Sequence, residues 1–182
     1  MIHTNTVPAQ DALFLSWYDS YAADIYRYVI LRIGVKEVAE DIVSEIFLSA
    51  WKHRARYNSG KASAKTWLFT IAKNALIDHY RKTKPQSELF ENIKDGTDLM
   101  ETIHWNLLSD EIQVALQKLT KEQREIVELR VWHGFSHAEI AQLVSKDERA
   151  VRVMFHRSLQ SLKKHISPQS YLSFLFFPFL FS

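Results

Sequence analysis

The chain has 182 residues, and its 23 Lys and Arg against 21 Asp and Glu give a formal net charge of +2 at pH 7. Only four Gly and four Pro occur while 47% of the residues are hydrophobic, which favours a mostly helical globular protein over a disordered one. The chain has no cysteine, so disulfides, thiolate metal sites and a cysteine nucleophile are excluded.

Helical periodicity in the first half predicts a bundle of three helices. Apolar residues recur every three or four positions and do not alternate as in a strand. We expect helices at about 12–33, 36–54 and 64–82, the first of which ends at Gly34, a residue suited to the left-handed position after a helix. Residues 57–62 are rich in turn-forming residues and should form a loop.

A basic block covers the last part of this bundle. Between Lys52 and Lys84, nine Lys and Arg oppose one acid, Asp78, a local charge of +8. Aromatic residues are interleaved with these charges: Trp51, Tyr57, Trp67, Phe69 and Tyr80. Cations beside aromatic rings suit single-stranded nucleic acid, because phosphates are neutralised and bases can stack. Trp67, however, shares a helical stripe with Ile71 and is better explained as a core residue.

An acidic segment separates the two halves of the chain. Between Gln86 and Glu111, seven acids oppose one lysine, a local charge of −6. The apolar periodicity is poor, so we expect residues 84–106 to be a flexible linker, with at most a short helix near 99–107.

The second half predicts four further helices, at about 109–118, 121–133, 137–144 and 148–165. Capping signals separate them. We expect capping boxes at Thr120 with Gln123 and at Ser136 with Glu139. Gly134 should end the helix between them, and Asp147 should cap the last helix. The last helix has an apolar stripe that should face inward: Val151, Phe155, Leu159 and Leu162.

The last two of these helices have the layout of a helix-turn-helix. A short helix and a long basic one are joined by a tight polar turn at 145–147, and the second helix of such a motif lies in the major groove of DNA. The outward face of the second helix should hold Arg149, Arg152, His156 and Arg157. Arginine suits both guanine and phosphate contacts. An ordinary solvated helix face explains an isolated helical hairpin at least as well, so the hairpin alone does not decide.

Three stretches together resemble, in order and spacing, the extracytoplasmic-function (ECF) sigma factors of bacterial RNA polymerase, within the sigma-70 family. They are residues 38–52 (VAEDIVSEIFLSAWK), 67–81 (WLFTIAKNALIDHYR) and 119–157. The resemblance covers about residues 13–166 and implies an all-α fold of two small helical domains joined by a flexible linker. The implied parts are a region 2 domain at 11–83, an acidic linker at 84–106, a region 4 domain with the helix-turn-helix at 107–166, and a hydrophobic tail of unknown role at 167–182.

The resemblance also implies roles for individual residues. Three acids one turn apart would dock on core RNA polymerase, although a merely solvated acidic face would look the same: Glu37, Asp41 and Glu45. The loop and the following helix would melt and hold the −10 element with Tyr57, Lys61, Lys65, Asn74, Arg81 and Lys82. Asn74 resembles a base-contacting asparagine of the family, and Arg81 and Lys82 would hold phosphates.

The last helix would read the −35 element through Arg149, Arg152, His156 and Arg157. Here the chain departs from the family pattern. Ser145 replaces the usual turn glycine, Glu148 begins a helix whose start is commonly small and polar, and Met154 stands where a second basic residue is frequent. We expect an altered −35 preference or a weaker phosphate grip, with DNA binding retained.

The implied function is promoter-directed initiation of transcription. The implied partners are the largest and second-largest subunits of core RNA polymerase, promoter DNA, and an anti-sigma factor that could be membrane-bound. No cofactor, metal, small-molecule substrate or catalytic activity is expected, because the eight histidines are scattered and no glycine-rich phosphate loop occurs. A stand-alone helix-turn-helix regulator is the alternative. Residues 1–12 do not read as a secretory signal, which favours the cytoplasm.

The C-terminal stretch 171–182 (YLSFLFFPFLFS) is not explained by the family. It is too short to span a bilayer, which needs about 20 apolar residues. We expect it either to fold back on a helical domain or to meet a partner, or else to be an accidental extension of the reading frame.

Overall fold

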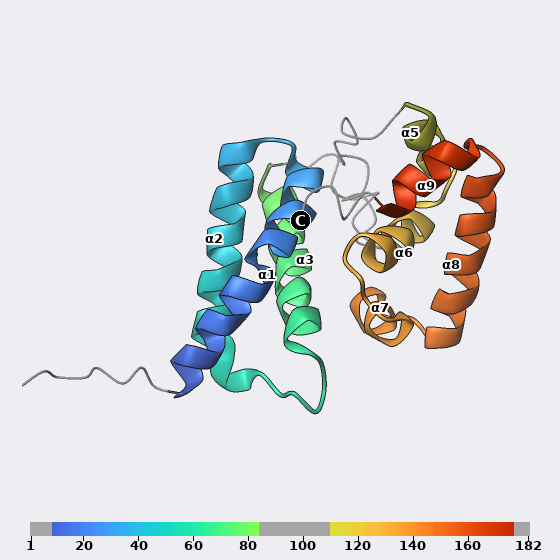
Figure 1. Ribbon diagram of the computed structural model, residues 1–182. Helices are drawn as coiled ribbons and strands as arrows, with labels where there is room; N and C mark the ends of the chain where they lie inside the picture. Colours follow the sequence, from blue (N-terminus) through green and yellow to red (C-terminus); the bar gives the residue numbers. More distant parts are fainter. Residues whose placement is uncertain (1–8, 84–109, 177–182) are drawn as a thin grey trace, which may run out of the picture.

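The computed structural model describes residues 9–83 and 110–176, and every regular element in these two ranges is a helix. Figure 1 shows two helical bundles side by side, one from each half of the chain. The expected all-α class is therefore confirmed. The expected linker and its short helix near 99–107 lie outside the described residues.

The first bundle contains α1 (Ala9–Ile33), α2 (Lys36–His53), the 3-10 turn η1 (Arg54–Arg56) and α3 (Ala64–Thr83). Gly34 has a φ of 72°, so it takes the left-handed position that ends α1. The core between the three helices is formed by fully buried apolar side chains: Ile25, Val29, Ile46, Leu68, Ala72 and Leu76.

The second bundle contains α5 (Asp110–Gln117), α6 (Lys121–Val131), α7 (His137–Val144), α8 (Glu148–Lys163) and α9 (Pro168–Phe176). The expected caps are confirmed. Thr120 and Ser136 each form a capping box with the residue three positions later, and the Asp147 carboxylate accepts from two backbone N–H groups at the start of α8. Gly134 ends the preceding helical segment with a φ of 66°.

Helix α9 was not expected from the sequence. Phe174 of this helix is fully buried, with its ring 5.6 Å from that of Trp132. The Glu111 carboxylate of α5 accepts hydrogen bonds from Ser167 and Ser170 at the other end of α9. The described part of the C-terminal stretch thus folds back on the second bundle, which was one of the expected outcomes, and residues 177–182 lie outside the description.

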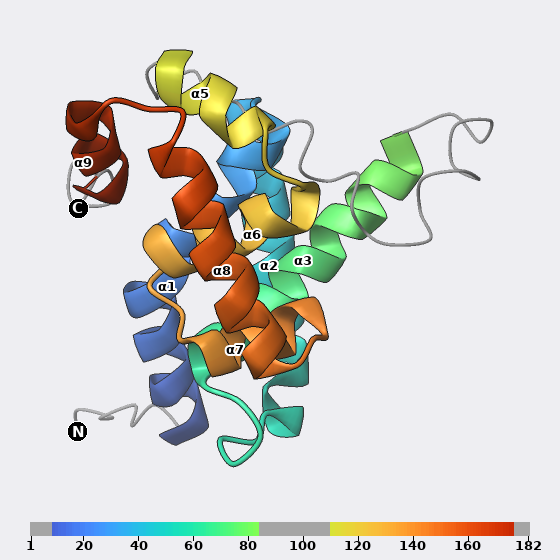
Figure 2. The same cartoon turned by 90° about the vertical axis from the view of Figure 1, so that its right-hand side faces the viewer.

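One hydrophobic cluster extends across both bundles. Phe69 of α3 packs edge-on against Phe135, at 4.8 Å between ring centroids, and Ile126 and Leu129 of α6 belong to the same buried cluster. Figures 1 and 2 place α6 and α7 toward the first bundle, with α8 on the opposite, outer side. This packing was not predicted from the sequence.

Candidate functional surfaces

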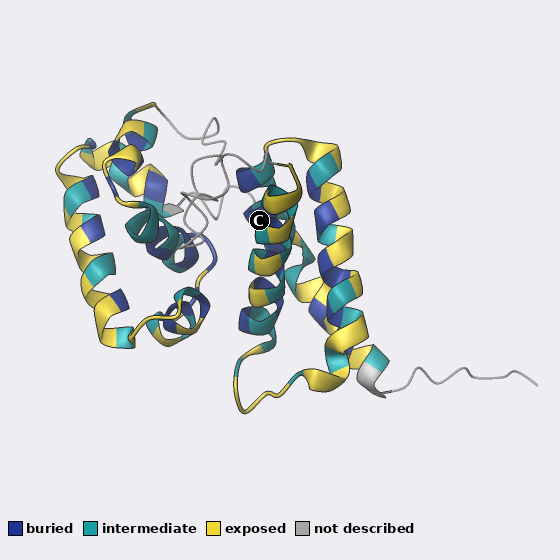
Figure 3. Cartoon of the chain, turned by 180° about the vertical axis from the view of Figure 1, so that it is seen from behind, coloured by how far each residue is buried: buried dark blue, intermediate teal, exposed yellow. Residues whose placement is uncertain are grey.

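The acids expected to dock on polymerase lie on the outer face of α2. Glu37, Asp41 and Glu45 are all exposed, and Figure 3 shows α2 alternating between a buried inner stripe and an exposed outer one. Asp41 and Glu45 also line a groove of about 490 Å³ between α2 and α3, to which Glu37 does not contribute. The stripe is therefore available to a partner of opposite charge.

The same groove brings together two sets of residues that the sequence assigned to different roles. Asn74 and Lys82 of α3, expected to bind the −10 element, line it opposite Asp41 and Glu45. At the end of α3, Arg81 is exposed and lies 3.8 Å from Asp78. Polymerase docking and strand binding would thus use neighbouring surfaces.

The loop before α3 is held by aromatic packing. The half-buried Tyr57 ring lies 4.7 Å from Trp17 and 5.4 Å from Trp67, measured between ring centroids. Trp67 is itself half-buried, in agreement with its expected core role. Lys61 is exposed at the loop. Tyr57 therefore has a structural role as well as the proposed nucleic-acid contact.

Helix α8 presents its basic residues to solvent. Arg149, Arg152, His156 and Arg157 are exposed, as the periodicity predicts. Of the expected inward stripe, Val151 and Leu162 are buried, and Phe155 and Leu159 are half-buried against the core. Glu148 pairs with Arg152 one turn later, so the acid at the start of this helix holds one of the arginines.

The turn between α7 and α8 shows how Ser145 stands in for glycine. It has a φ of 54°, the only positive φ of a non-glycine residue among those that the structure describes. This left-handed position is strained for residues with a Cβ atom. Ser145 thus takes the left-handed backbone conformation that a glycine adopts without strain.

Residues 9–83 and 110–176 show neither a metal-binding cluster nor a membrane-spanning helix. This part of the chain holds no group of three potential metal ligands from His, Cys, Asp and Glu. None of its helices is long and apolar enough to cross a membrane.

Comparison with known proteins matches both halves to one family. The family model described as Sigma-70 region 2 matches residues 17–86, and that described as Sigma-70, region 4 matches residues 109–162. ECF RNA polymerase sigma factor SigL of Mycobacterium tuberculosis is 30% identical over 164 residues, which cover 85% of this chain and 89% of SigL. This chain belongs to the ECF sigma factors.

Other relatives agree with this assignment. SigX of Bacillus subtilis is 30% identical over 82% of this chain and 81% of its own length. BldN of Streptomyces coelicolor is also 30% identical, over 81% of this chain, but the match spans only 58% of BldN. The fold is similar to that of the Bartonella quintana sigma factor RpoE in complex with the anti-sigma factor NepR, with a TM-score of 0.59 and 20% identity over 83% of this chain and 94% of that one.

A buried ion pair joins the two bundles of this sigma factor. The Arg32 guanidinium at the end of α1 donates two hydrogen bonds of 2.7 Å to the two carboxylate oxygens of Glu128 in α6. Both side chains are at most 1% exposed, and the guanidinium also lies 3.6 Å from the centroid of the Tyr28 ring. The sequence reasoning missed this pair.

Charge and burial act against each other in this cluster. Burial by itself would lower the pKa of Arg32, but the Glu128 carboxylate raises it above its usual range. Burial by itself would raise the pKa of Glu128, but Arg32 and His133 hold it below its usual value. His133 lies between the rings of Tyr28 and Phe69, and burial lowers its pKa, so it is neutral at pH 7. The pair is ionised and the histidine is not.

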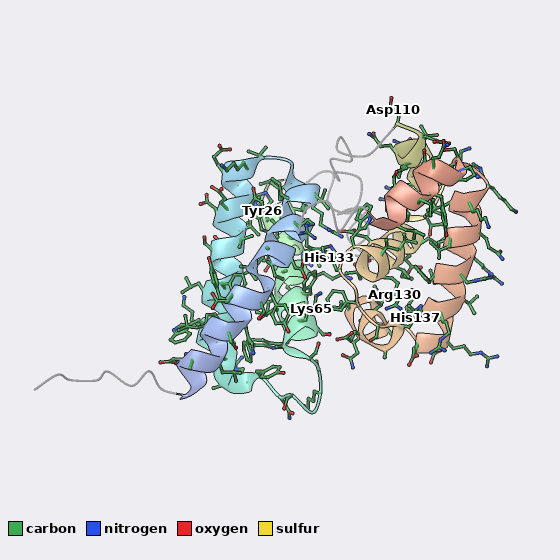
Figure 4. The ribbon with its side chains drawn as sticks, in the orientation of Figure 1. Tyr26, Lys65, Asp110, Arg130, His133 and His137 are labelled. Carbon is green, nitrogen blue, oxygen red and sulfur yellow. The ribbon has the colours of Figure 1, made fainter. Side chains whose placement is uncertain are left out.

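Lys65, expected to bind the −10 element, also lies at this interface. Its ammonium group is 3.1 Å from the Asp24 carboxylate and donates a 2.5 Å hydrogen bond to the backbone carbonyl of His133. Figure 4 shows Lys65 and His133 where the two bundles meet. Lys65 is therefore engaged within the protein itself.

Proposed function

We propose that this sigma factor binds core RNA polymerase, holds the unpaired strand of the −10 element with α3 and the preceding loop, and reads the −35 element with α8. The observation that carries the proposal is the exposed basic face of α8, a helix that lies on the side of the second bundle away from the first (Figure 1) and carries three exposed arginines and one exposed histidine. A helix that presents its N-terminal arginines in this way suits the major groove.

Three groups of residues would perform the three tasks. Glu37, Asp41 and Glu45 would dock on polymerase. The −10 strand would be held by Tyr57, Lys61, Lys65, Asn74, Arg81 and Lys82, and the −35 duplex by Arg149, Arg152, His156 and Arg157. The exposure of most of these side chains and their grouping on three surfaces support these roles.

We infer that the protein catalyses nothing itself and acts in the cytoplasm, where polymerase supplies the chemistry. We also propose an anti-sigma factor as a regulator. Its support is that two proteins of similar fold, RpoE and CnrH, were solved with the anti-sigma factor NepR and the cytosolic domain of CnrY. The domain limits 11–83 and 107–166, with the tail from 167, remain part of this proposal.

The test is run-off transcription and footprinting with purified core polymerase on genomic promoter fragments. Arg152→Ala should weaken promoter binding by about 1–3 kcal/mol and reduce protection of the −35 element, because a base-reading arginine is lost. Lys118→Ala, which removes an exposed cation at the end of α5, is the control and should leave the footprint unchanged. An unchanged footprint with Arg152→Ala would refute the assigned role.

Omitting core polymerase tests the alternative function. A sigma factor should bind promoter DNA well only with polymerase, whereas a stand-alone regulator would shift the same fragment unaided. Strong binding without core polymerase would favour the regulator.

A further inference from the structure

The basic face of α8 contains one large apolar side chain that is exposed, that of Val153. It is 44% exposed, whereas the next two residues, Met154 and Phe155, are half-buried against the hydrophobic cluster that extends across both bundles. Val153 was not among the residues expected to bind DNA. An apolar group is therefore present on a face that is otherwise suited to phosphates and polar base edges.

Val153 lies near the middle of this face. It follows Arg149 by four residues and precedes Arg157 by four, so one arginine flanks it about one helical turn away on each side. The buried side chains of Val151 and Leu162 lie on the opposite side of the helix, and Figure 3 shows α8 with buried residues inward and exposed ones outward. A DNA duplex that contacts both arginines must also meet the valine.

The position of Val153 is more informative than its exposure. A single exposed apolar side chain is common on protein surfaces and by itself indicates no partner. A β-branched residue is also a poorer helix former than alanine, so Val153 does not favour α8 through its helix propensity. Its place between two arginines is what indicates a contact with DNA.

The flanking arginines are available to such a ligand. Neither Arg149 nor Arg157 pairs with an acid within residues 9–83 and 110–176, and both are exposed. Arg152 differs, because the Glu148 carboxylate holds its guanidinium. The two cations beside Val153 can thus contact guanine or phosphate while the valine faces the groove between them.

The major groove offers one apolar group to a side chain of this kind. Thymine presents a C5-methyl group there, whereas guanine, adenine and cytosine present hydrogen-bond donors and acceptors. We propose that Val153 is a specificity-determining residue that selects a thymine in the −35 element through contact with this methyl group. The inference rests on the proposed function, in which α8 reads that element.

The test uses holoenzyme assembled from core polymerase and the full chain, on a promoter identified by run-off transcription. Each thymine of the −35 element is replaced in turn by deoxyuridine, which keeps the base pair and removes only the C5-methyl group. Titration of labelled promoter duplex at one fixed salt concentration gives the affinity, because binding to DNA depends strongly on salt.

With the unmodified protein, uracil at one position should weaken binding roughly fourfold, the factor expected when one methyl group is lost from an apolar contact. Val153→Ala should weaken binding to the thymine promoter by a similar factor. It should also abolish the difference between thymine and uracil at that position, because the side chain that senses the methyl group is gone.

Val114→Ala is the matched control. Val114 lies on α5 and is 53% exposed, so the same atoms are removed from a valine of similar exposure on another helix of the second bundle. This variant should bind as the unmodified protein does and keep the difference between thymine and uracil. Circular dichroism should show the same helix content in both variants, since neither side chain is buried.

Three outcomes would overturn the role of Val153. They are a −35 element without thymine, equal binding of thymine and uracil duplexes at every position, and a thymine–uracil difference that persists in Val153→Ala. Failure of the proposed function would look different, as absence of run-off transcripts with the unmodified chain and core polymerase, and this inference would fall with it. A transcribing chain that binds thymine and uracil promoters alike would refute the role of Val153 alone.

Discussion

At the scale of single residues, the position of a residue along a helix predicted whether its side chain is exposed. It did not predict which residue that side chain contacts. The four basic residues of α8 are exposed as the periodicity predicts. Arg32 sits in the last turn of α1, where a basic residue normally faces solvent and the helix dipole. The usable signal lay in α6, where Glu128 interrupts the apolar run Ile126, Val127 and Leu129, since a charge inside such a run must find a buried partner.

Phe174 tests the packing of the C-terminal helix. Phe174→Ala should lower the free energy of unfolding by about 3–5 kcal/mol, because a large side chain is removed from a fully buried site against Trp132. Urea denaturation monitored by circular dichroism measures the change. Leu172→Ala on the same helix, at a side chain that is 54% exposed, should change stability little. Equal losses for the two variants would contradict the observed burial.

At the scale of elements, capping chemistry made the helix limits predictable. The seven expected helices match those observed to within three residues at each end, and α7 matches at both. Helix α9 was missed because its aromatic run has no clear period. Ser167 and Pro168 were the available signal, since Ser is a good N-cap and Pro is favoured at the first helical position.

Asp147 allows the cap of the DNA-reading helix to be tested. Asp147→Ala should destabilise the protein by about 1 kcal/mol, because two backbone N–H groups at the start of α8 lose their acceptor. Asp147→Asn should retain most of the stability, since asparagine caps as well as aspartate does. Thermal denaturation compares the two, and an equal loss would mean that charge, not capping, is what Asp147 contributes.

At the scale of the whole molecule, the sequence predicted two helical bundles but not their mutual packing. Lys65 and Lys73 have the same pattern whether they face solvent, nucleic acid or another helix. Their partners, Asp24 and Glu125, lie on other helices, so periodicity within one element carries no information about the pairing. Only the assembled structure places Lys65 and Lys73 of α3 against the second bundle.

The buried histidine predicts how stability depends on pH. Burial lowers the pKa of His133 from its ordinary value of 6.5, so the folded protein binds its proton less readily than the unfolded chain does. The free energy of unfolding should therefore fall as pH decreases through about 6.5, where the unfolded chain takes up the proton. The stability lost by protonating Glu128 belongs to a lower range, below its ordinary pKa of 4.5.

His133→Phe should reduce this dependence, because the aromatic ring is kept and the titrating group removed. Urea midpoints at about pH 7.5 and about pH 5.5 should differ less in the variant than in the unmodified protein. His137, whose pKa burial also lowers, should maintain part of the dependence in both. An identical fall of the midpoint in the two proteins would exclude His133 as its source.

The wide separation of Arg32 and Glu128 along the chain has a consequence for synthesis. The two residues are 96 positions apart, so a ribosome adding roughly 5–20 residues per second makes Glu128 about 5–20 s after Arg32. During that interval the nascent first bundle has an uncovered α3. Each newly made molecule therefore passes through a stage in which Phe69 and Lys73 of α3 lack their neighbours from the second bundle.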